Sequence, residues 1–261
     1  MSHPLTQWGV LFSIDGKTAL VTGGSRGIGK MIATGFVEAG AKVYIAARKH
    51  AASEETAAEL SKVGECIALE ADLSTEDGCR GLAAEIASRE ERLDILVNNA
   101  GATWAVPIEE FGDAAWDRAL SVNLKGVFHV TKFLLPQLRA AGTREDPSRV
   151  INIGSIDGLR APRMETYSYS ASKAAVHMLT RHLAAKLAPE ITVNAIAPGP
   201  FESKMMAETL RTFGDQIVAS APLKRIGRPD DVAGTAIFLS SRAGSYLTGA
   251  VIPVDGGIST L

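Results

Sequence analysis

The chain has 261 residues, of which 46% are hydrophobic and 21% are charged, and its formal net charge at pH 7 is −2. A chain of this length can bury a full core, so residues 1–261 are expected to form a single domain. The small net charge argues against a nucleic acid or an anionic membrane as partner and leaves a small molecule as the expected one.

Cysteine usage and the first residues of the chain predict a cytoplasmic protein. The two cysteines, Cys66 and Cys79, lie in a predicted strand and a predicted helix, and the five histidines fit no metal-ligand spacing. Residues 1–12 lack the basic and apolar regions of a signal peptide, and no apolar run reaches the roughly 18 residues of a membrane span. We therefore expect no disulfide, no metal and no membrane segment, and we expect His177 and His182 on a helix surface or at an interface.

Short apolar runs alternate with longer segments of helical spacing along the chain. The runs predict strands at Thr18–Thr22, Lys42–Ala46, Cys66–Leu69, Asp94–Asn98, Val150–Ile153, Ile191–Ile196 and Val251–Val254. The helical segments are Ile28–Ala39, Ala51–Val63, Asp77–Arg89, Ala114–Ala141 and Ser170–Ala188. This alternation predicts an α/β fold, a doubly wound Rossmann-type domain with a seven-stranded parallel sheet and helices on both faces. Because Pro253 has no N–H to donate, the last strand should lie at a sheet edge.

Residues 200–227 break this alternation, and we interpret them as a helical excursion that covers the substrate. A glycine-rich stretch, residues 22–29, follows the first predicted strand directly and opens the first helix. Glycines allow positive φ and leave no side chain between backbone and ligand, so the N–H groups and the helix N-terminus can face a pyrophosphate. The letters alone also fit an ordinary turn, but the order strand, turn, helix favours a dinucleotide site.

The spacing Thr-Gly-x-x-x-Gly-x-Gly resembles that of the short-chain dehydrogenase/reductase family, and the resemblance extends over nearly the whole chain. It includes Asp72-Leu73, the run Asn98-Asn99-Ala100-Gly101, and the pair Tyr169 and Lys173. Within the family the chain is most similar to 3-oxoacyl reductases of the branch associated with bacterial rhamnolipid synthesis. The resemblance implies catalytic roles for Asn123, Ser155, Tyr169 and Lys173, and cofactor contacts from Gly23, Ser25, Arg26, Gly27, Ile28, Gly29, Asp72, Leu73, Asn99, Ala100, Gly101, Tyr169, Lys173, Pro198 and Gly199.

The end of the second predicted strand favours NADP(H) over NAD. Folds that select NAD place an Asp or Glu about 20 residues after the glycines, but here the strand ends Ala46-Ala47-Arg48-Lys49. A 2′-phosphate would meet Arg48, together with Arg26 from the glycine turn, and guanidinium groups suit phosphate binding. The alternative is that both arginines are solvated surface cations.

Tyr169 and Lys173 predict the proton chemistry of a ketone reductase. Hydride transfer to a ketone builds negative charge on its oxygen, and a tyrosine can supply the proton if a nearby cation lowers its pKa from about 10. Lys173 stands four residues after Tyr169, on the same helix face. Tyr167 has Ala171 at that offset, so we expect it to be a packing or substrate-pocket residue. The resemblance implies that Lys173 also holds the nicotinamide ribose.

Two polar residues are candidates to assist this pair. Ser155 follows a predicted central strand, where its hydroxyl can orient a substrate oxygen, although a serine in such a place is also a common turn or helix cap. Asn123 lies inside a predicted helix, and the resemblance implies a water-linked proton relay from it to Lys173. Taken alone, it also fits a surface or kinked-helix asparagine.

The segment Ala114–Ala141 is apolar around much of its circumference, and this favours burial against another subunit over a single core-facing stripe. The resemblance implies a homotetramer, and burial within the monomer is the alternative. The leading hypothesis is an NADPH-linked reductase of a ketone, including 3-oxoacyl thioesters. A polyol or gluconate-type dehydrogenase and a non-catalytic nucleotide sensor are the alternatives. The candidate apolar pocket residues are Trp104, Met164, Phe201, Met205, Met206 and Phe213.

Overall fold

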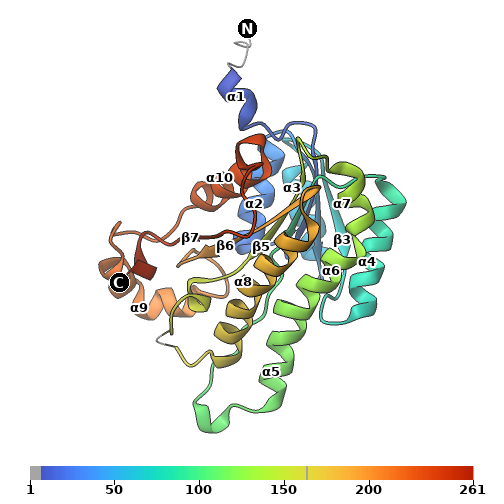
Figure 1. Cartoon of the computed structure of the whole chain (residues 1–261). Coiled ribbons are helices and arrows are strands. Elements are labelled where there is room, and N and C mark those ends of the chain that lie inside the picture. Colours follow the sequence, from blue (N-terminus) through green and yellow to red (C-terminus); the bar gives the residue numbers. More distant parts are fainter. Residues whose placement is uncertain (1–6, 163, 261) are drawn as a thin grey trace.

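The computed structural model describes residues 7–162 and 164–260. The sequence expectation for residues 1–12 therefore falls partly on residues 1–6, which lie outside the described residues. Seven parallel strands in these ranges form one sheet in the order β3-β2-β1-β4-β5-β6-β7 (Figure 1). This confirms the predicted sheet and the edge position of the strand that carries Pro253. The strands are β1 Thr18–Thr22, β2 Lys42–Ala47, β3 Cys66–Glu70, β4 Ile95–Asn98, β5 Ser148–Ile153, β6 Ile191–Pro198 and β7 Val251–Val254.

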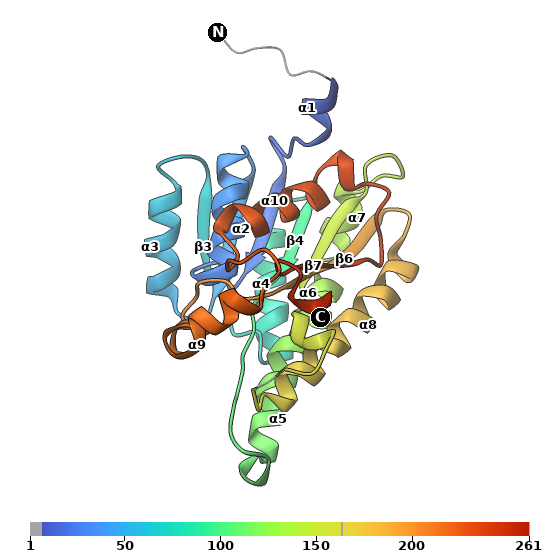
Figure 2. The ribbon, with the colours of Figure 1, turned by 90° about the vertical axis from the view of Figure 1, so that its left-hand side faces the viewer.

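Helices cover both faces of this sheet, as the sequence predicts (Figures 1 and 2). The strands read as continuous apolar runs because both their faces are buried: Val21 packs in one core cluster and its neighbour Leu20 in the other. The first cluster joins the sheet to α2 (Gly27–Glu38), α3 (His50–Leu60) and α10 (Pro229–Ser240). The second joins it to α4 (Glu76–Arg89), α6 (Val127–Phe133), α7 (Leu135–Ala141) and α8 (Tyr167–Leu187).

The long helix predicted at Ala114–Ala141 is divided in the structure, and this corrects the prediction. It comprises α5 (Asp113–Leu120), a π-helical turn at Ser121–Gly126, and then α6 and α7. Pro136 lacks the N–H that a continuous helix would need, so α6 ends and α7 begins around Leu134. Such π turns occur frequently at functional sites, and this one contains Asn123.

The remaining segments lie at the two ends of the sheet. A short helix α1 (Gln7–Leu11) precedes β1, and α9 (Ala207–Ser220) lies across the end toward which the strands run (Figure 2). The predicted excursion at residues 200–227 therefore does contain a helix. Single 3₁₀ turns occur at Ile108–Glu110, Ile156–Gly158, Arg242–Gly244 and Ile258–Thr260. Among the described helices, none combines the length and the apolar character that crossing a bilayer requires.

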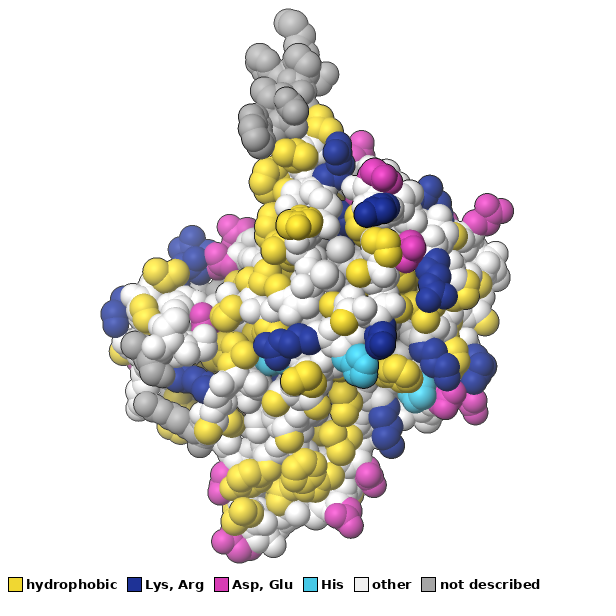
Figure 3. Space-filling model, in the orientation of Figure 1, with side chains coloured by type: hydrophobic (Ala, Val, Ile, Leu, Met, Phe, Trp, Pro, Cys, Tyr) yellow, Lys and Arg dark blue, Asp and Glu magenta, His cyan; other side chains and the backbone are white. Residues whose placement is uncertain are grey.

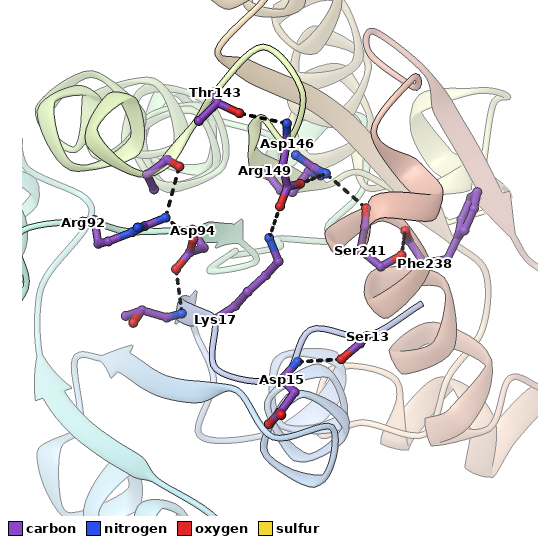
Figure 4. A network of polar contacts seen from close by, with 12 residues as sticks. Ser13, Asp15, Lys17, Arg92, Asp94, Thr143, Asp146, Arg149, Phe238 and Ser241 are labelled. Carbon is purple, nitrogen blue, oxygen red and sulfur yellow. Dashed lines mark hydrogen bonds and ion pairs between the residues drawn. The ribbon is translucent and has the colours of Figure 1, made fainter. Parts of the chain in front are cut away.

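A polar network holds the amino ends of the strands, opposite the end that carries the predicted site (Figure 4). Arg149, only 1% exposed, donates hydrogen bonds to the Asp146 carboxylate at 2.8 Å and to the Ser241 carbonyl at 3.1 Å. Lys17 binds the same carboxylate at 3.1 Å, and the Asp94 carboxylate accepts from the Thr18 N–H at 2.9 Å. These contacts link the starts of β1, β4 and β5, so the opposite ends of these strands are also aligned.

Candidate active site

The carboxyl ends of the parallel strands bring the predicted site residues to one edge of the sheet. The glycine turn follows β1, the run 99–101 follows β4, and Ser155 follows β5. Pro198 ends β6, and Gly199 donates its N–H to Val254 at 3.0 Å. From β1, the strands β2 and β3 are added on one side of the sheet, and β4 to β7 are added on the other side. Ligands of open α/β sheets bind at the switch point between two such strands, here β1 and β4.

Asn99 fastens the glycine turn to the end of β4. Its side-chain nitrogen donates to the carbonyls of Thr22 at 2.8 Å and Gly23 at 3.2 Å. Gly23 has a φ of 66°, which favours glycine, and a Cβ atom on Gly29 would lie 2.4 Å from both the Asn99 amide nitrogen and the Gly23 carbonyl oxygen. The absence of side chains at these positions is therefore required by the turn itself.

Thr22 is a residue of this site that the sequence reasoning did not single out. Its hydroxyl oxygen accepts hydrogen bonds from the backbone N–H groups of Asn99 at 2.9 Å and Ala100 at 3.0 Å, and it donates to the Val97 carbonyl at 3.3 Å. The threonine directly before the glycines was the available signal. It positions the first residues after β4 against the glycine turn.

The glycine turn fits a dinucleotide pyrophosphate. Gly27 has a φ of 54° and begins α2, and a Cβ atom added there would meet only the Ser203 side chain, at 3.3 Å. The open side of the turn thus presents backbone and the positive end of a helix, which together favour an anion. Ser25 and Ile28 are partly buried in this turn, and Arg26 is exposed at the N-cap of α2.

Arg48 and Asp72 lie at the ends of adjacent strands β2 and β3. Hydrogen bonds from the Ser74 hydroxyl, at 2.7 Å, and the Ser74 N–H, at 3.0 Å, lower the pKa of the Asp72 carboxyl, and the Arg48 charge lowers it further. Arg48 is exposed and lines a cavity of about 420 Å³ together with Ser74 and Ala102. Leu73, the neighbour of Asp72, is buried.

Tyr169 and Lys173 share one face of α8, as their spacing predicts, but the lysine does not make the phenol acidic. The Lys173 ammonium nitrogen lies 5.6 Å from the centre of the Tyr169 ring and donates to the Ile153 carbonyl at 2.7 Å. Burial raises the pKa of Tyr169 to about 12, with Ser155 opposing and Asp157 adding to the shift. Burial also lowers the pKa of Lys173 to about 8. The structure therefore holds a protonated phenol at neutral pH.

Ser155 forms the cap that the sequence offers as one alternative, while its role toward a substrate oxygen stays a prediction. Its oxygen accepts a hydrogen bond from the Asp157 N–H at 3.1 Å and so caps the 3₁₀ turn at Ile156–Gly158. Its hydroxyl also hydrogen-bonds the Tyr169 side chain, which lowers the pKa of the phenol. A hydroxyl has one proton and two lone pairs, so the cap uses a lone pair and leaves the proton to point at the Tyr169 oxygen or, in its place, at a substrate oxygen.

Asn123 is buried in the π turn, where the protein meets its hydrogen-bonding capacity. Its oxygen accepts from the Ala102 N–H at 2.8 Å, and its amide nitrogen donates to the Ala102 carbonyl and to the Ser172 hydroxyl, both at 2.9 Å. The asparagine oxygen and the Lys173 nitrogen both lie beside Gly101, at 3.4 and 3.8 Å from where its Cβ would be. The surface alternative for Asn123 is wrong, while the water-linked relay stays a prediction.

Two other predictions for α8 have different outcomes. Tyr167 donates to the Glu165 carboxylate at 3.2 Å and packs edge-on against Phe111, so its role in packing is confirmed. His177 is 3% exposed, and its expected place on the helix surface is wrong. Its ring contacts Gly154 and Gly158, which stand before and after Ser155 in the chain. Because these glycines are about 20 residues away in sequence, helical spacing does not reveal the contact. His182 is exposed, as expected.

Residues 200–227 bring exposed apolar side chains to the same edge. Trp104, Met164, Met205 and Phe213 are each between 42% and 50% exposed, and the Thr209 hydroxyl lies 3.7 Å from the Met164 sulfur. Met206 is partly buried, whereas Phe201 is 1% exposed and packs in the core, so its inclusion among the pocket residues is wrong. A cavity of about 720 Å³ is lined by Glu202, Ser203, Lys204, Ala207, Leu210, Arg211, Gly214, Val218 and Ile226.

Neither cysteine forms a disulfide, and both are buried. In residues 7–162 and 164–260, no group of three or more His, Cys, Asp or Glu side chains is arranged to hold a metal ion.

Comparisons with known proteins agree with this architecture. A family model described as enoyl-(acyl carrier protein) reductase matches residues 23–259. The chain is 48% identical over 252 residues to the rhamnolipids biosynthesis 3-oxoacyl-[acyl-carrier-protein] reductase of Pseudomonas aeruginosa, which covers 94% of this chain and 97% of that protein.

Two solved structures are similar over nearly the whole chain. The RhlG/NADP active-site complex of Pseudomonas aeruginosa has a TM-score of 0.93 and 47% identity, covering 96% of this chain and 99% of that one. A gluconate 5-dehydrogenase of Burkholderia cenocepacia in complex with NADP and tartrate has a TM-score of 0.89 and 33% identity, covering 97% and 98%. The chain therefore belongs to the short-chain dehydrogenase/reductase family.

The glycine turn gives a direct test of nucleotide binding. In Gly29→Ala the new Cβ displaces Asn99 or the Gly23 carbonyl, so the Kd for NADPH should rise roughly tenfold or more, the equivalent of about 1.4 kcal/mol. Isothermal titration calorimetry measures it. Gly81→Ala in α4 is the matched control, because its Cβ meets no atom within 4 Å and the substitution should leave the Kd unchanged. Equal affinities for Gly29→Ala and wild type would contradict the assignment.

Proposed function

We propose that this protein is an NADPH-dependent carbonyl reductase that transfers hydride to a ketone, with a 3-oxoacyl thioester as substrate and Tyr169 as the proton donor. The observation that carries the proposal is the Tyr169 phenol, hydrogen-bonded by Ser155 and with the Lys173 nitrogen 5.6 Å from its ring centre, on the same edge of the sheet as the glycine turn. The reductase name of the Pseudomonas relative supports the choice of substrate.

The cofactor proposal depends on charge at the end of β2. No acid stands there to accept from a ribose hydroxyl, whereas Arg48 and Arg26 are both exposed and free to meet a 2′-phosphate. Both of the similar structures described above were solved with NADP. We assign the phosphate and adenine contacts to Gly23, Ser25, Arg26, Gly27, Ile28, Gly29, Arg48, Asp72 and Leu73, and the contacts nearer the nicotinamide to Asn99, Ala100, Gly101, Tyr169, Lys173, Pro198 and Gly199.

The protein's own groups handle the ketone oxygen. The bound nicotinamide supplies the hydride, and negative charge then grows on the oxygen. Ser155 donates a hydrogen bond to that oxygen, and Tyr169 gives it a proton. The conjugate acid of an alkoxide has a pKa near that of water, about 15.7, so a phenol of pKa about 12 still donates its proton downhill. Lys173 holds α8 against β5, and Asn123 fixes the segment after β4.

The raised pKa of Tyr169 also favours reduction over oxidation. Oxidation of an alcohol needs a phenolate as base, and little phenolate exists at neutral pH when the pKa is about 12. The gluconate 5-dehydrogenase neighbour keeps a polyol or gluconate-type dehydrogenase as the second candidate function. A non-catalytic nucleotide sensor is the third, and the buried polar arrangement around Tyr169 argues against it.

The surroundings of the site fit an acyl substrate. The exposed Trp104, Met164, Met205 and Phe213 offer apolar surface for a chain, and we propose that residues 200–227 cover it as part of one domain spanning residues 1–261. We also propose a cytoplasmic location.

We also propose that the protein is a homotetramer. Phe128 of α6 is 41% exposed and Met178 of α8 is 62% exposed, and an interface over both helices would remove these apolar side chains from water. Figure 3 shows hydrophobic side chains gathered on the lower part of this face, where Figure 1 has α5 and α8.

Tyr169→Phe tests the proton donor. Without the hydroxyl, NADPH-dependent reduction of acetoacetyl thioesters should fall by roughly 10² to 10⁴-fold, while the Kd for NADPH stays near the wild-type value. Tyr167→Phe is the control, since its hydroxyl binds only Glu165 among the described residues and its loss should leave kcat unchanged. Rates should be measured for wild type with NADPH and NADH on acetoacetyl thioesters, crotonoyl thioester, cyclic ketones and keto-sugars. Turnover retained by Tyr169→Phe, or reduction confined to the crotonoyl thioester, would overturn the proposed reaction.

The pH dependence of the reverse reaction follows from the same phenol. Because the pKa of Tyr169 is about 12, the phenolate fraction, and with it the rate of alcohol oxidation, should rise about tenfold per pH unit between pH 7 and 9. Initial rates with NADP and a 3-hydroxyacyl thioester give the slope. A plateau in that range would show that the phenol titrates far below this value.

The oligomer prediction concerns the exposed face of α6 and α8. Light scattering after size-exclusion chromatography should give four times the monomer mass for wild type and a smaller species for Phe128→Asp combined with Met178→Asp, because carboxylates would be buried in the interface. Phe213→Asp, on α9 and 50% exposed, should remain a tetramer. A monomeric wild type contradicts the proposal.

A further inference from the structure

The face of α8 that carries Tyr169 and Lys173 continues one turn further to His177. These three residues are spaced four apart, so they form a stripe along one side of the helix. The stripe meets the end of β5: Lys173 binds the Ile153 carbonyl, and the next residue, Gly154, lies against the His177 ring. Ser155 follows directly, so the contact is made one residue before the serine of the site.

The His177 ring fills a gap that two glycines leave open. A Cβ atom on Gly154 would lie 2.2 Å from the His177 Nε2 atom, and a Cβ atom on Gly158 would lie 2.8 Å from its Cε1 atom. Gly154 precedes Ser155, and Gly158 ends the 3₁₀ turn that Ser155 caps. The ring therefore supports this turn on both sides of Ser155.

The histidine makes this contact as a neutral ring. Neither ring nitrogen has a hydrogen-bond partner among the described residues. Burial lowers the pKa of His177 to about 4, the backbone of Gly158 opposes this, and the charges of Lys173 and Arg181 lower it further. A neutral ring brings no charge to the site, so we attribute its contribution to the space that it fills beside Gly154.

We propose that His177 is a positioning residue that sets the distance between the Ser155 turn and the part of α8 that carries Tyr169 and Lys173. The inference rests on the proposed function, because it assigns the effect to Ser155 acting on the ketone oxygen. Ser155 and Tyr169 are held on different elements, and a shift of about 1 Å at such a pair can reduce a rate by roughly 100-fold. The His177 side chain fills the space between α8 and Gly154, the residue directly before Ser155.

The test begins with two variants of His177, each compared with wild type for kcat, KM and thermal unfolding. His177→Ala should lower kcat by roughly tenfold or more with little change in the KM for NADPH, because the Ser155 turn loses its support while the glycine turn is untouched. His177→Met keeps a similar volume without ring nitrogens and should stay close to wild type. Loss of rate in both, with no difference between them, would mean that the nitrogens act and that spacing does not.

A second-site pair tests the contact itself. Gly154→Ala alone should lower both Tm and kcat, because its Cβ meets the His177 ring. In a His177→Ala background the same change should be relieved, since the nearest remaining atom is the Ile196 carbonyl oxygen at 3.3 Å. Gly158→Ala is the matched control: its Cβ lies 2.7 Å from backbone atoms of Lys173 and Ala174, so His177→Ala cannot relieve it. Equal relief at both glycines would overturn the assignment.

A double-mutant cycle with Ser155→Ala separates positioning from general stability. If His177 acts through Ser155, His177→Ala should reduce kcat in wild type but cause little further loss once Ser155 is gone. The same factor of loss in both backgrounds would overturn the proposal. A wild type that reduces no ketone would instead overturn the proposed function. In that case the Tm values would still show His177→Ala relieving Gly154→Ala but not Gly158→Ala, so the two failures can be distinguished.

Discussion

The hydrogen bond from the buried Lys173 ammonium to the Ile153 carbonyl is the contact on which the site depends. It joins α8, which carries the phenol, to the end of β5, which leads into Ser155. A buried cation needs a partner, so this bond stabilises the amine in its place. The polar network at the amino ends of the strands acts together with it, because strands aligned at one end are aligned at the other.

The fold could be predicted almost completely because the strands are buried on both faces. Such strands are short apolar runs that stand out from helical spacing, and Pro253 identified an edge strand by its missing N–H. The division of the helix at Pro136 was also readable, since proline ends a helix. The π turn was not, because it depends on bonds from Asn123 to Ala102 and Ser172, which come from other segments.

The sequence predicts which residues come together at the site, but it does not predict their pKa values. The glycine turn, Ser155 and the Tyr169 and Lys173 pair come together as their spacing indicates. The raised pKa of the phenol could not be predicted, because helical spacing brings the lysine near while the effect of burial on the pKa depends on the whole fold. His177 was misplaced for the same reason: its burial depends on two glycines that are remote in sequence and give it room.

Burial acts on Tyr169 and Lys173 in the same chemical sense, toward the neutral form of each group, and this bears on the direction of the reaction. With a pKa of about 8, the lysine is still mostly charged at pH 7, while the phenol, at about 12, keeps its proton. An acid of that strength can protonate an alkoxide but is seldom available as a base. A more solvated site would bring the pKa of the phenol back toward its ordinary value of about 10 and so raise the phenolate fraction at a given pH. The environment of Tyr169, and not only its spacing from Lys173, therefore sets how much base form this residue offers.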